Sequence, residues 1–272
     1  MSGPSQTKAS EPVDVAALDH WSRIAVQLER AHGNQRVPMR ADYTWSVLHA
    51  ADVARHLQIP AISVVELGVA GGHGLVALEA AAKLAESELG VEVAVHGFDT
   101  GSGLPTPVDH RDAPYLMATG DFPMDEERLR ARLERATLHL GDVKETIPAF
   151  VAAGDAPPVG FVANDLDYYS SSMDAFNLFL APPELLLPRI MCYFDDTLGY
   201  PWGHINGEQL AITDFNEAHP QRQLSHLDGL RWMVPAGEFD ARWTEAMYVA
   251  HALDHPRYAE DEGVTWSRRL DL

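Results

Sequence analysis

Two apolar runs of strand length, each ending in a pair of aspartates, constrain the fold more than any other part of this chain. The runs are residues 160–167 and 190–196, and the pairs are Asp165 with Asp167 and Asp195 with Asp196. If the runs are neighbouring parallel strands, about 4.8 Å apart, the four carboxylates meet at one edge of the sheet. Ionised carboxylates that close either bind protons or are neutralised by a cation, so the pattern predicts a divalent metal site. The alternative is two ordinary strand-to-helix turns in which the aspartates cap the following helices.

The rest of the chain predicts one α/β domain with a helical extension. Apolar residues at helical spacing indicate helices over 13–31 and 42–57. From residue 61 onward, β-branched runs alternate with helical patterns, and two short strands are expected over 223–226 and 246–253. This order predicts a doubly wound, mostly parallel sheet of seven strands. We therefore expect a mobile start over 1–12, N-terminal helices over 13–60 and the α/β domain over 61–272.

Composition excludes several kinds of partner. The chain has 40 acidic and 20 basic residues, and its formal charge of -20 repels nucleic acid and anionic membranes, which favours a small-molecule partner. No apolar run reaches membrane-spanning length, and Met1 to Pro12 lacks the pattern of a signal peptide. The single cysteine, Cys192, excludes an intramolecular disulfide. We expect a cytoplasmic protein, and a homo-oligomer is compatible with a sheet of this class.

The first predicted strand leads into a glycine-rich turn and then a helix. This order forms a cradle for a nucleotide cofactor, because glycine lets a ligand lie against bare backbone. A dinucleotide fingerprint that starts at Gly68 would need glycine in place of Ala70, and the looser form that starts at Gly72 stays open. Glu66 stands two residues before Gly68, where it would oppose a phosphate but can meet an ammonium. The turn therefore favours a cofactor that carries an amino acid group.

Acids also follow the next two predicted strands. The strand over 91–98 ends at Asp99, at a distance appropriate to an acid that accepts hydrogen bonds from a ribose diol. The strand over 136–140 leads to Asp142, which would lie at the same sheet edge and could approach an adenine amino group. Residues 106–123 between them form a long loop, which is either a lid or a disordered connection.

Five segments together carry a resemblance to a known family. They are residues 66–72, 99–105, 141–142, 165–174 and 194–196. In these segments the chain resembles class I S-adenosylmethionine-dependent methyltransferases with a Rossmann-like fold. More narrowly, it is similar to the metal-dependent macrocin O-methyltransferase group, which methylates hydroxyls of sugars and other natural products. The resemblance covers about residues 62–219, and the paired aspartates are its most specific part.

That resemblance implies S-adenosylmethionine as the cofactor and Mg²⁺ or another divalent cation as the metal. The implied cofactor-binding residues are Glu66, Gly68 and Val69 around the methionine part, Asp99 on the ribose and Asp142 near the adenine, with Gly72 and Thr100 as further cofactor-binding residues. The implied metal ligands are Asp165, Asp195 and Asp196, and the implied general base is Asp167. In one place the chain departs from the group, which often has an acidic residue after the tyrosine of this motif, whereas here Ser170 follows Tyr169.

The predicted reaction is O-methylation of a small hydroxylated metabolite. A hydroxyl next to a divalent cation becomes more acidic, and Asp167 could then take its proton. His204 and His226 are the reserve candidates for the base, because histidine titrates near neutral pH. Two other functions stay open. One is a nicotinamide-dependent oxidoreductase, which would need a closer match to the dinucleotide-binding glycine fingerprint. The other is a non-catalytic protein that binds S-adenosylmethionine.

Overall fold

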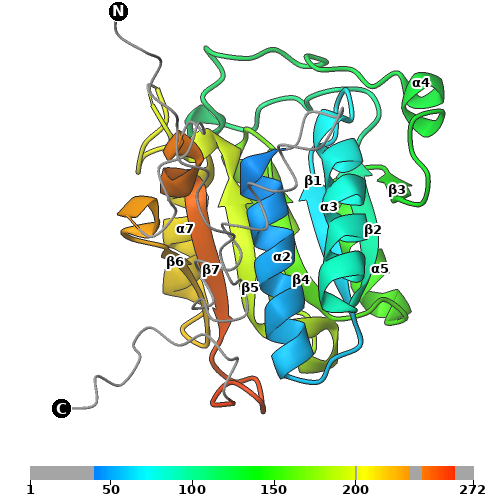
Figure 1. The fold of residues 1–272 in the computed structure, drawn as a ribbon. Coiled ribbons are helices and arrows are strands. Elements are labelled where there is room, and N and C mark those ends of the chain that lie inside the picture. The colour runs from blue at the N-terminus through cyan, green and yellow to red at the C-terminus, as the bar shows by residue number, and fades with distance from the viewer. Residues whose placement is uncertain (1–39, 200, 233–240, 261–272) are drawn as a thin grey trace, which may run out of the picture.

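The computed structural model describes residues 40–199, 201–232 and 241–260. In this part of the chain, seven strands form one sheet in the order β3-β2-β1-β4-β5-β7-β6 (Figure 1). The strands are β1 (Ala61–Leu67), β2 (Glu92–Asp99), β3 (Thr137–Leu140), β4 (Val159–Asn164), β5 (Leu186–Phe194), β6 (Arg222–His226) and β7 (Met247–Ala252). Strands β1 to β5 pair in parallel, whereas β7 runs antiparallel to both β5 and β6. The predicted doubly wound, mostly parallel sheet is confirmed.

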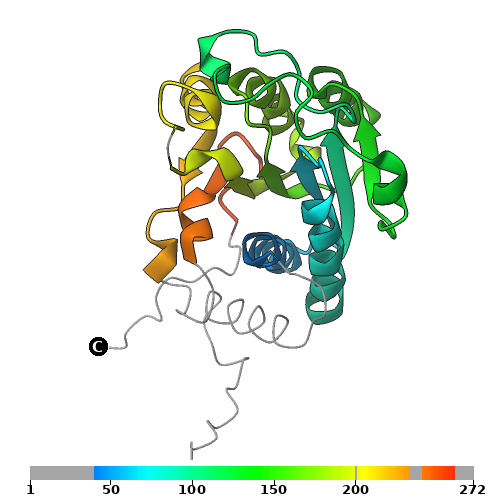
Figure 2. The ribbon, with the colours of Figure 1, turned by 90° about the horizontal axis from the view of Figure 1, so that it is seen from above.

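Helices cover both faces of the sheet, as Figure 2 shows from above. One face carries α2 (Ala41–His56) and α3 (His73–Leu89), and the other carries α5 (Val143–Ala153), α6 (Tyr169–Ala175) and α7 (Gly207–Ala218). A short helix, α4 (Glu126–Arg130), precedes β3. Asp125 caps this helix, because its side chain accepts a hydrogen bond from the backbone N–H of Arg128.

Helix α2 crosses the middle of the sheet and supplies much of the core on that face. It contacts β1, β4 and β5, and its Trp45 and Leu48 are fully buried. Every residue of β4 is buried as well, as expected for a parallel strand with helices on both faces. Residues 57–60 alone join α2 to β1, so the first turn of α2 lies at the edge of the sheet where β1 and β4 end (Figure 1).

Strand β5 begins earlier than predicted. The sequence indicates a strand from Ile190, whereas the structure begins it at Leu186 and includes Pro188. The pairing of β4 with β5 shifts in register between Val159 and Phe161. A proline cannot donate to a regular ladder but is tolerated at such an irregularity, which explains why this stretch did not read as a strand.

The helical segment that follows β4 is divided between two kinds of helix. Its α-helical part begins at Tyr169 and ends at Ala175, after which Phe176–Leu180 form a 3₁₀ helix. The predicted helix over 13–31, and the mobile start expected before it, lie outside the described residues. Among the helices that the structure describes, none is long and apolar enough to cross a membrane.

Candidate functional site

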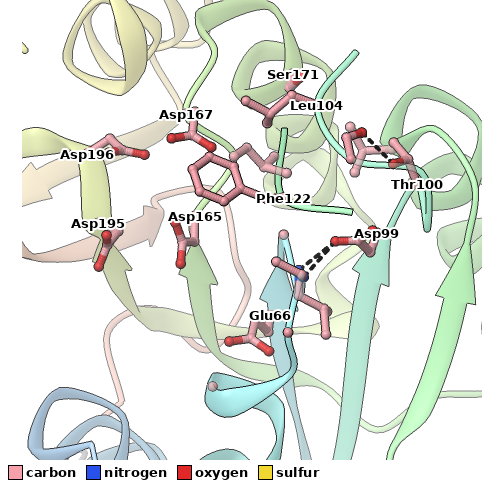
Figure 3. Close-up of a pocket in the computed structure, with 18 of the residues that line it drawn as sticks. Glu66, Asp99, Thr100, Leu104, Phe122, Asp165, Asp167, Ser171, Asp195 and Asp196 are labelled. Atoms are coloured by element: carbon pink, nitrogen blue, oxygen red, sulfur yellow. Dashed lines mark hydrogen bonds between the residues drawn. The ribbon is translucent and has the colours of Figure 1, made fainter. Parts of the chain in front are cut away.

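A pocket of about 480 Å³ lies at the edge where β1, β2, β4 and β5 end. Four aspartates lie on one side of it, and Asp99 and Thr100 lie on the other (Figure 3). All of the predicted cofactor, metal and catalytic residues line this pocket: Glu66, Gly68, Val69, Gly72, Asp99, Thr100, Asp142, Asp165, Asp167, Asp195 and Asp196. The structure therefore brings the predicted residues together, although their roles stay predictions.

The glycine-rich turn between β1 and α3 passes close to its neighbours. Gly68 has φ +84°, and a Cβ there would meet the backbone carbonyl of Asp165. A Cβ at Gly74, in the first turn of α3, would meet the carboxylate of Glu66. Only glycine leaves room at these two positions, so the turn can lie against both the end of β4 and the buried acid of β1.

Glu66 is buried below this turn and is only half satisfied. It is 2% exposed, and its Oε1 accepts a hydrogen bond from the hydroxyl of Tyr43 at 3.0 Å. Its Oε2 is buried without a partner among the described residues. Burial, partly offset by the Tyr43 bond, raises the pKa of Glu66 to about 8. A buried acceptor without a donor is costly, so this oxygen suits a ligand that brings an N–H group.

Asp99 and Asp142 each have a structural role at the pocket. Asp99 Oδ2 accepts hydrogen bonds from the backbone N–H groups of Val69 and Ala70, both at 2.9 Å, and its Oδ1 accepts one from Gly101 at 2.6 Å. Because a carboxylate has about four acceptor positions, Asp99 keeps room for a ribose hydroxyl. Asp142 caps α5 by accepting a hydrogen bond from the backbone N–H of Lys144, a role that the sequence analysis did not assign to it.

The four aspartates gather at the ends of β4 and β5, as the parallel pairing predicts. The pKa of Asp165 is raised by burial and then by the charges of Asp195 and Asp167. The pKa of Asp196 is raised by burial and then by Asp167 and Asp165. Burial also raises the pKa of Asp167, and its interaction with Asp196 partly offsets this rise. These carboxyls are close enough to repel one another, and such a cluster attracts either protons or a cation.

Asp195 is bound differently from the other three. Its Oδ1 accepts a hydrogen bond from the hydroxyl of Tyr193 at 2.6 Å and one from Arg40 Nη2 at 3.4 Å. Arg40 also binds Asp42 at 2.7 Å and lies over the ring of Tyr43. Sequence reasoning missed Arg40 and Tyr43, because no pattern in the chain links the start of α2 to this sheet edge.

The donor set fits a hard, partly hydrated cation. Within the described ranges, no group of three or more His, Cys, Asp or Glu side chains is arranged as a complete metal site. Asp196 Oδ2, however, is buried without a hydrogen-bond partner in the same part of the chain, next to the acidic pocket. Mg²⁺ usually binds one or two carboxylates and keeps several waters, so it does not need a full cage of side chains.

Asp167, the predicted base, stands in a strained turn. Its φ is +60°, a value that residues other than glycine rarely adopt. The backbone N–H of Tyr168 lies 2.5 Å from the carbonyl oxygen of Leu166, so the chain folds back tightly around Asp167. Neither reserve candidate lines the pocket, and His226 instead binds Asp228 and a backbone carbonyl.

The long loop over 106–123 is held against α6. Asp112 is 1% exposed, and it accepts hydrogen bonds from the backbone N–H and the hydroxyl of Ser170 at 2.8 and 2.9 Å. Further along the loop, Met117 and Phe122 line the pocket. The loop is therefore an ordered wall of the site and not a disordered connection, whereas its role as a lid stays a prediction.

Tyr169, the residue before Ser170, makes a second contact with the same loop. Arg111 donates to the hydroxyl of Tyr169 at 3.0 Å and stacks over its ring, and that hydroxyl donates to Asp214 at 2.8 Å. The Tyr169-Ser170 pair, where the sequence departs from the macrocin-type pattern, is therefore used to fasten the loop.

Comparison with solved structures supports the fold. The chain is similar to CalS11, a calicheamicin methyltransferase, with a TM-score of 0.52 and 20% identity over 90% of this chain and 99% of that one. It is also similar to the O-methyltransferase NovP, with a TM-score of 0.51 and 14% identity over 70% of this chain and 77% of that one. No protein-family model matches the chain, and no curated protein matches its sequence. The chain has the Rossmann-like methyltransferase fold, and the predicted fold class is confirmed.

Proposed function

We propose that this protein is an S-adenosylmethionine-dependent and divalent-metal-dependent O-methyltransferase that acts on a hydroxyl of a sugar or another natural product. One observation carries the proposal: a glycine-rich turn above a half-satisfied buried acid, Glu66, shares a single pocket with four clustered aspartates. The first feature suits a cofactor that carries an amino acid, and the second suits a hard cation. The methyltransferase fold is consistent with both.

The methionine end of the cofactor would lie between Glu66 and the start of α2. The ammonium group would donate to Glu66 Oε2, which has no partner in the described part of the chain. Arg40 lines the same pocket and binds Asp42 through Nε and Nη2, which leaves its Nη1 without a hydrogen bond to any described residue. That nitrogen offers a cation for the carboxylate of the amino acid.

The acceptor hydroxyl would lie on the aspartate side of the pocket. Asp165, Asp195 and Asp196 would hold the divalent ion, which when bound supplies positive charge that makes a nearby hydroxyl more acidic. Asp167 would accept the hydroxyl proton, and the raised pKa of this carboxyl makes it a stronger base than an exposed aspartate. The pocket aligns the two reactants, and Leu104, Met117 and Phe122 limit the access of water.

The acceptor itself is proposed to be small and not anionic. Seven acids line the pocket against one arginine, and that arginine already binds Asp42 and Asp195. An acidic wall repels phosphate-rich partners such as nucleic acid, in line with the formal charge of -20. Specificity would come from the loop over 106–123, which forms the outer wall.

Calorimetric titration and a transfer assay test the proposal. The protein should bind S-adenosylhomocysteine but not NAD⁺, and it should transfer a methyl group to members of a panel of hydroxylated natural products when Mg²⁺ is present. Asp167→Asn should keep cofactor binding and lose transfer. Binding of NAD⁺ alone would favour the oxidoreductase, and tight cofactor binding without transfer to any acceptor would favour the binding protein. Full activity in a chelator would remove the metal from the mechanism.

A further inference from the structure

Glu208, in the first turn of α7, is a buried acid that no part of the proposed chemistry uses. Its side chain is fully buried and does not line the pocket. Its Oε1 lies 2.5 Å from Asn164 Nδ2, and its Oε2 accepts a hydrogen bond from the backbone N–H of Asp196 at 3.1 Å. One carboxyl group therefore joins the end of β4 to the turn after β5.

The two groups that Glu208 joins are next to the proposed metal ligands. Asn164 directly precedes Asp165 in the chain, and its Nδ2 also donates to Ser172 at 3.0 Å. Asp196 stands in a short 3₁₀ turn, where its φ of -94° and ψ of 32° depart from helical values. Hydrogen bonds to the backbone of such a turn decide where its carboxylate points.

The burial of Glu208 needs an explanation beyond stability. Glu208 is 0% exposed, and burying a carboxyl group costs free energy even when it is hydrogen-bonded. An apolar side chain of similar size would avoid that cost. Buried polar groups that lower stability are expected where function requires them.

We propose that Glu208 is a positioning residue of the metal site, which sets the distance and orientation between Asp165 and Asp196 by fastening both strand ends. This inference rests on the proposed function, because it assumes that these two aspartates bind a divalent ion. Glu208 itself does not line the pocket and would not touch the ion. Groups that orient metal ligands in this way typically change metal affinity by about 10- to 100-fold when they are removed.

Two variants whose side chains are similar in size to glutamate distinguish the loss of the hydrogen bonds of Glu208 from a change in side-chain volume. In Glu208→Gln, the amide oxygen can still accept from Asp196, and the amide nitrogen can donate to Asn164 Oδ1, which has no partner in the described residues, once that amide rotates. In Glu208→Leu, the volume is filled but both hydrogen bonds are lost. Glu217→Leu, on the exposed face of the same helix, is the control.

Mn²⁺ affinity, measured by calorimetry with S-adenosylhomocysteine bound, is the deciding readout. We expect Glu208→Leu to weaken Mn²⁺ binding by about 10- to 100-fold. Glu208→Gln and the control should stay within about threefold of the wild type. The affinity for S-adenosylhomocysteine should stay the same in all of them, because Glu208 does not line the pocket.

The outcomes distinguish this inference from the proposed function. A folded Glu208→Leu protein with unchanged Mn²⁺ affinity overturns the positioning role while leaving the metal site in place. A wild type that binds S-adenosylhomocysteine but no Mn²⁺ removes the metal site, and the role of Glu208 with it. If Glu208→Leu does not fold, Asn164→Ala cuts the same link from the β4 side and should weaken Mn²⁺ binding in the same direction.

Discussion

Tyr43 donates its hydroxyl hydrogen to Glu66 Oε1 across 3.0 Å, and this bond ties the first turn of α2 to the pocket. The bond fixes the orientation of the Glu66 carboxylate, so that Oε2 remains for a ligand. Arg40 lies over the ring of Tyr43, and its charge acts on Glu66. Helix α2 thus brings a cation beside a buried acid, an arrangement that matches the two charges of an α-amino acid.

Replacing Arg40 should reduce the contribution that the carboxylate of the cofactor makes to binding affinity. The wild type should bind S-adenosylhomocysteine about 10- to 100-fold more tightly than the decarboxylated analogue, because a hydrogen bond to a charged group contributes about 1.5–3 kcal/mol. In Arg40→Gln the preference should fall to about threefold or less. Calorimetry without metal measures both ligands, and Arg55→Gln, in the last turn of α2, is the control. If Arg40→Gln still prefers S-adenosylhomocysteine over the decarboxylated analogue as strongly as the wild type does, the carboxylate does not bind Arg40.

Replacing Asp196 should have opposite effects on stability with and without metal. In a chelator, Asp196→Asn should raise the free energy of unfolding by about 1 kcal/mol, because one of several mutually repelling buried carboxyls is removed. The same change should abolish the rise in melting temperature that Mg²⁺ gives the wild type. Thermal unfolding in chelator and in Mg²⁺ measures both effects. Asp228→Asn, at a side chain that is 95% exposed, should leave both unchanged.

Replacing Asp167 tests whether its positive φ lowers the stability of the fold while its carboxyl group serves catalysis. Asp167→Gly should raise the free energy of unfolding by up to about 1 kcal/mol, because glycine adopts a φ of +60° without strain. Asp167→Asn should keep the positive φ, which asparagine tolerates, and should also become somewhat more stable in a chelator, because it removes a buried carboxyl of the same repelling cluster. Both variants should lose methyl transfer. Chemical denaturation and the transfer assay decide the matter, and a Gly variant that is markedly less stable than the wild type would contradict the strain.

The position of the site could be predicted from the sequence because it depends on local patterns. The runs that end at Asp165 and Asp196 identify two buried strands, and parallel strands end at the same edge. The glycine-rich turn after Glu66 adds the third strand of that edge. The exact start of β5 was missed, because Pro188 interrupts the pattern that marks a strand.

The partners of these acids could not be predicted, because they come from distant parts of the chain. Tyr43 and Glu66 are 23 residues apart, and Asn164 and Glu208 are 44 apart. Such contacts follow from how helices pack on the sheet, and a single sequence does not encode them in any periodic pattern. The acid at the end of β2 illustrates the same limit, since the sequence indicated a ribose contact for Asp99 but not its three bonds to nearby backbone.

A pair of histidines away from the pocket predicts a separate dependence of stability on pH. His96 on β2 lies 3.2 Å from His139 on β3, and its Nε2 is buried without a partner among the described residues. Burial, and then the neighbouring His139, lower the pKa of His96 to about 4. The folded protein therefore holds fewer protons at this site than the unfolded chain, whose pKa is about 6.5. Above about pH 6.5, protonation of His96 does not affect the free energy of unfolding. As the pH falls from there toward about 4, the unfolded chain binds the proton first, and the free energy of unfolding decreases.

His96→Phe should remove this dependence, because a phenyl ring takes no proton and can keep the edge contact with Phe150, whose ring centre lies 5.0 Å away. Urea unfolding between about pH 7 and pH 4.5 gives the free energies of unfolding of both proteins. The advantage of the variant over the wild type should grow by about 2 kcal/mol across that range. His110→Gln, at a side chain that is 86% exposed, should follow the wild type. Parallel curves for wild type and His96→Phe would mean that His96 takes up its proton as readily in the folded protein as in the unfolded chain.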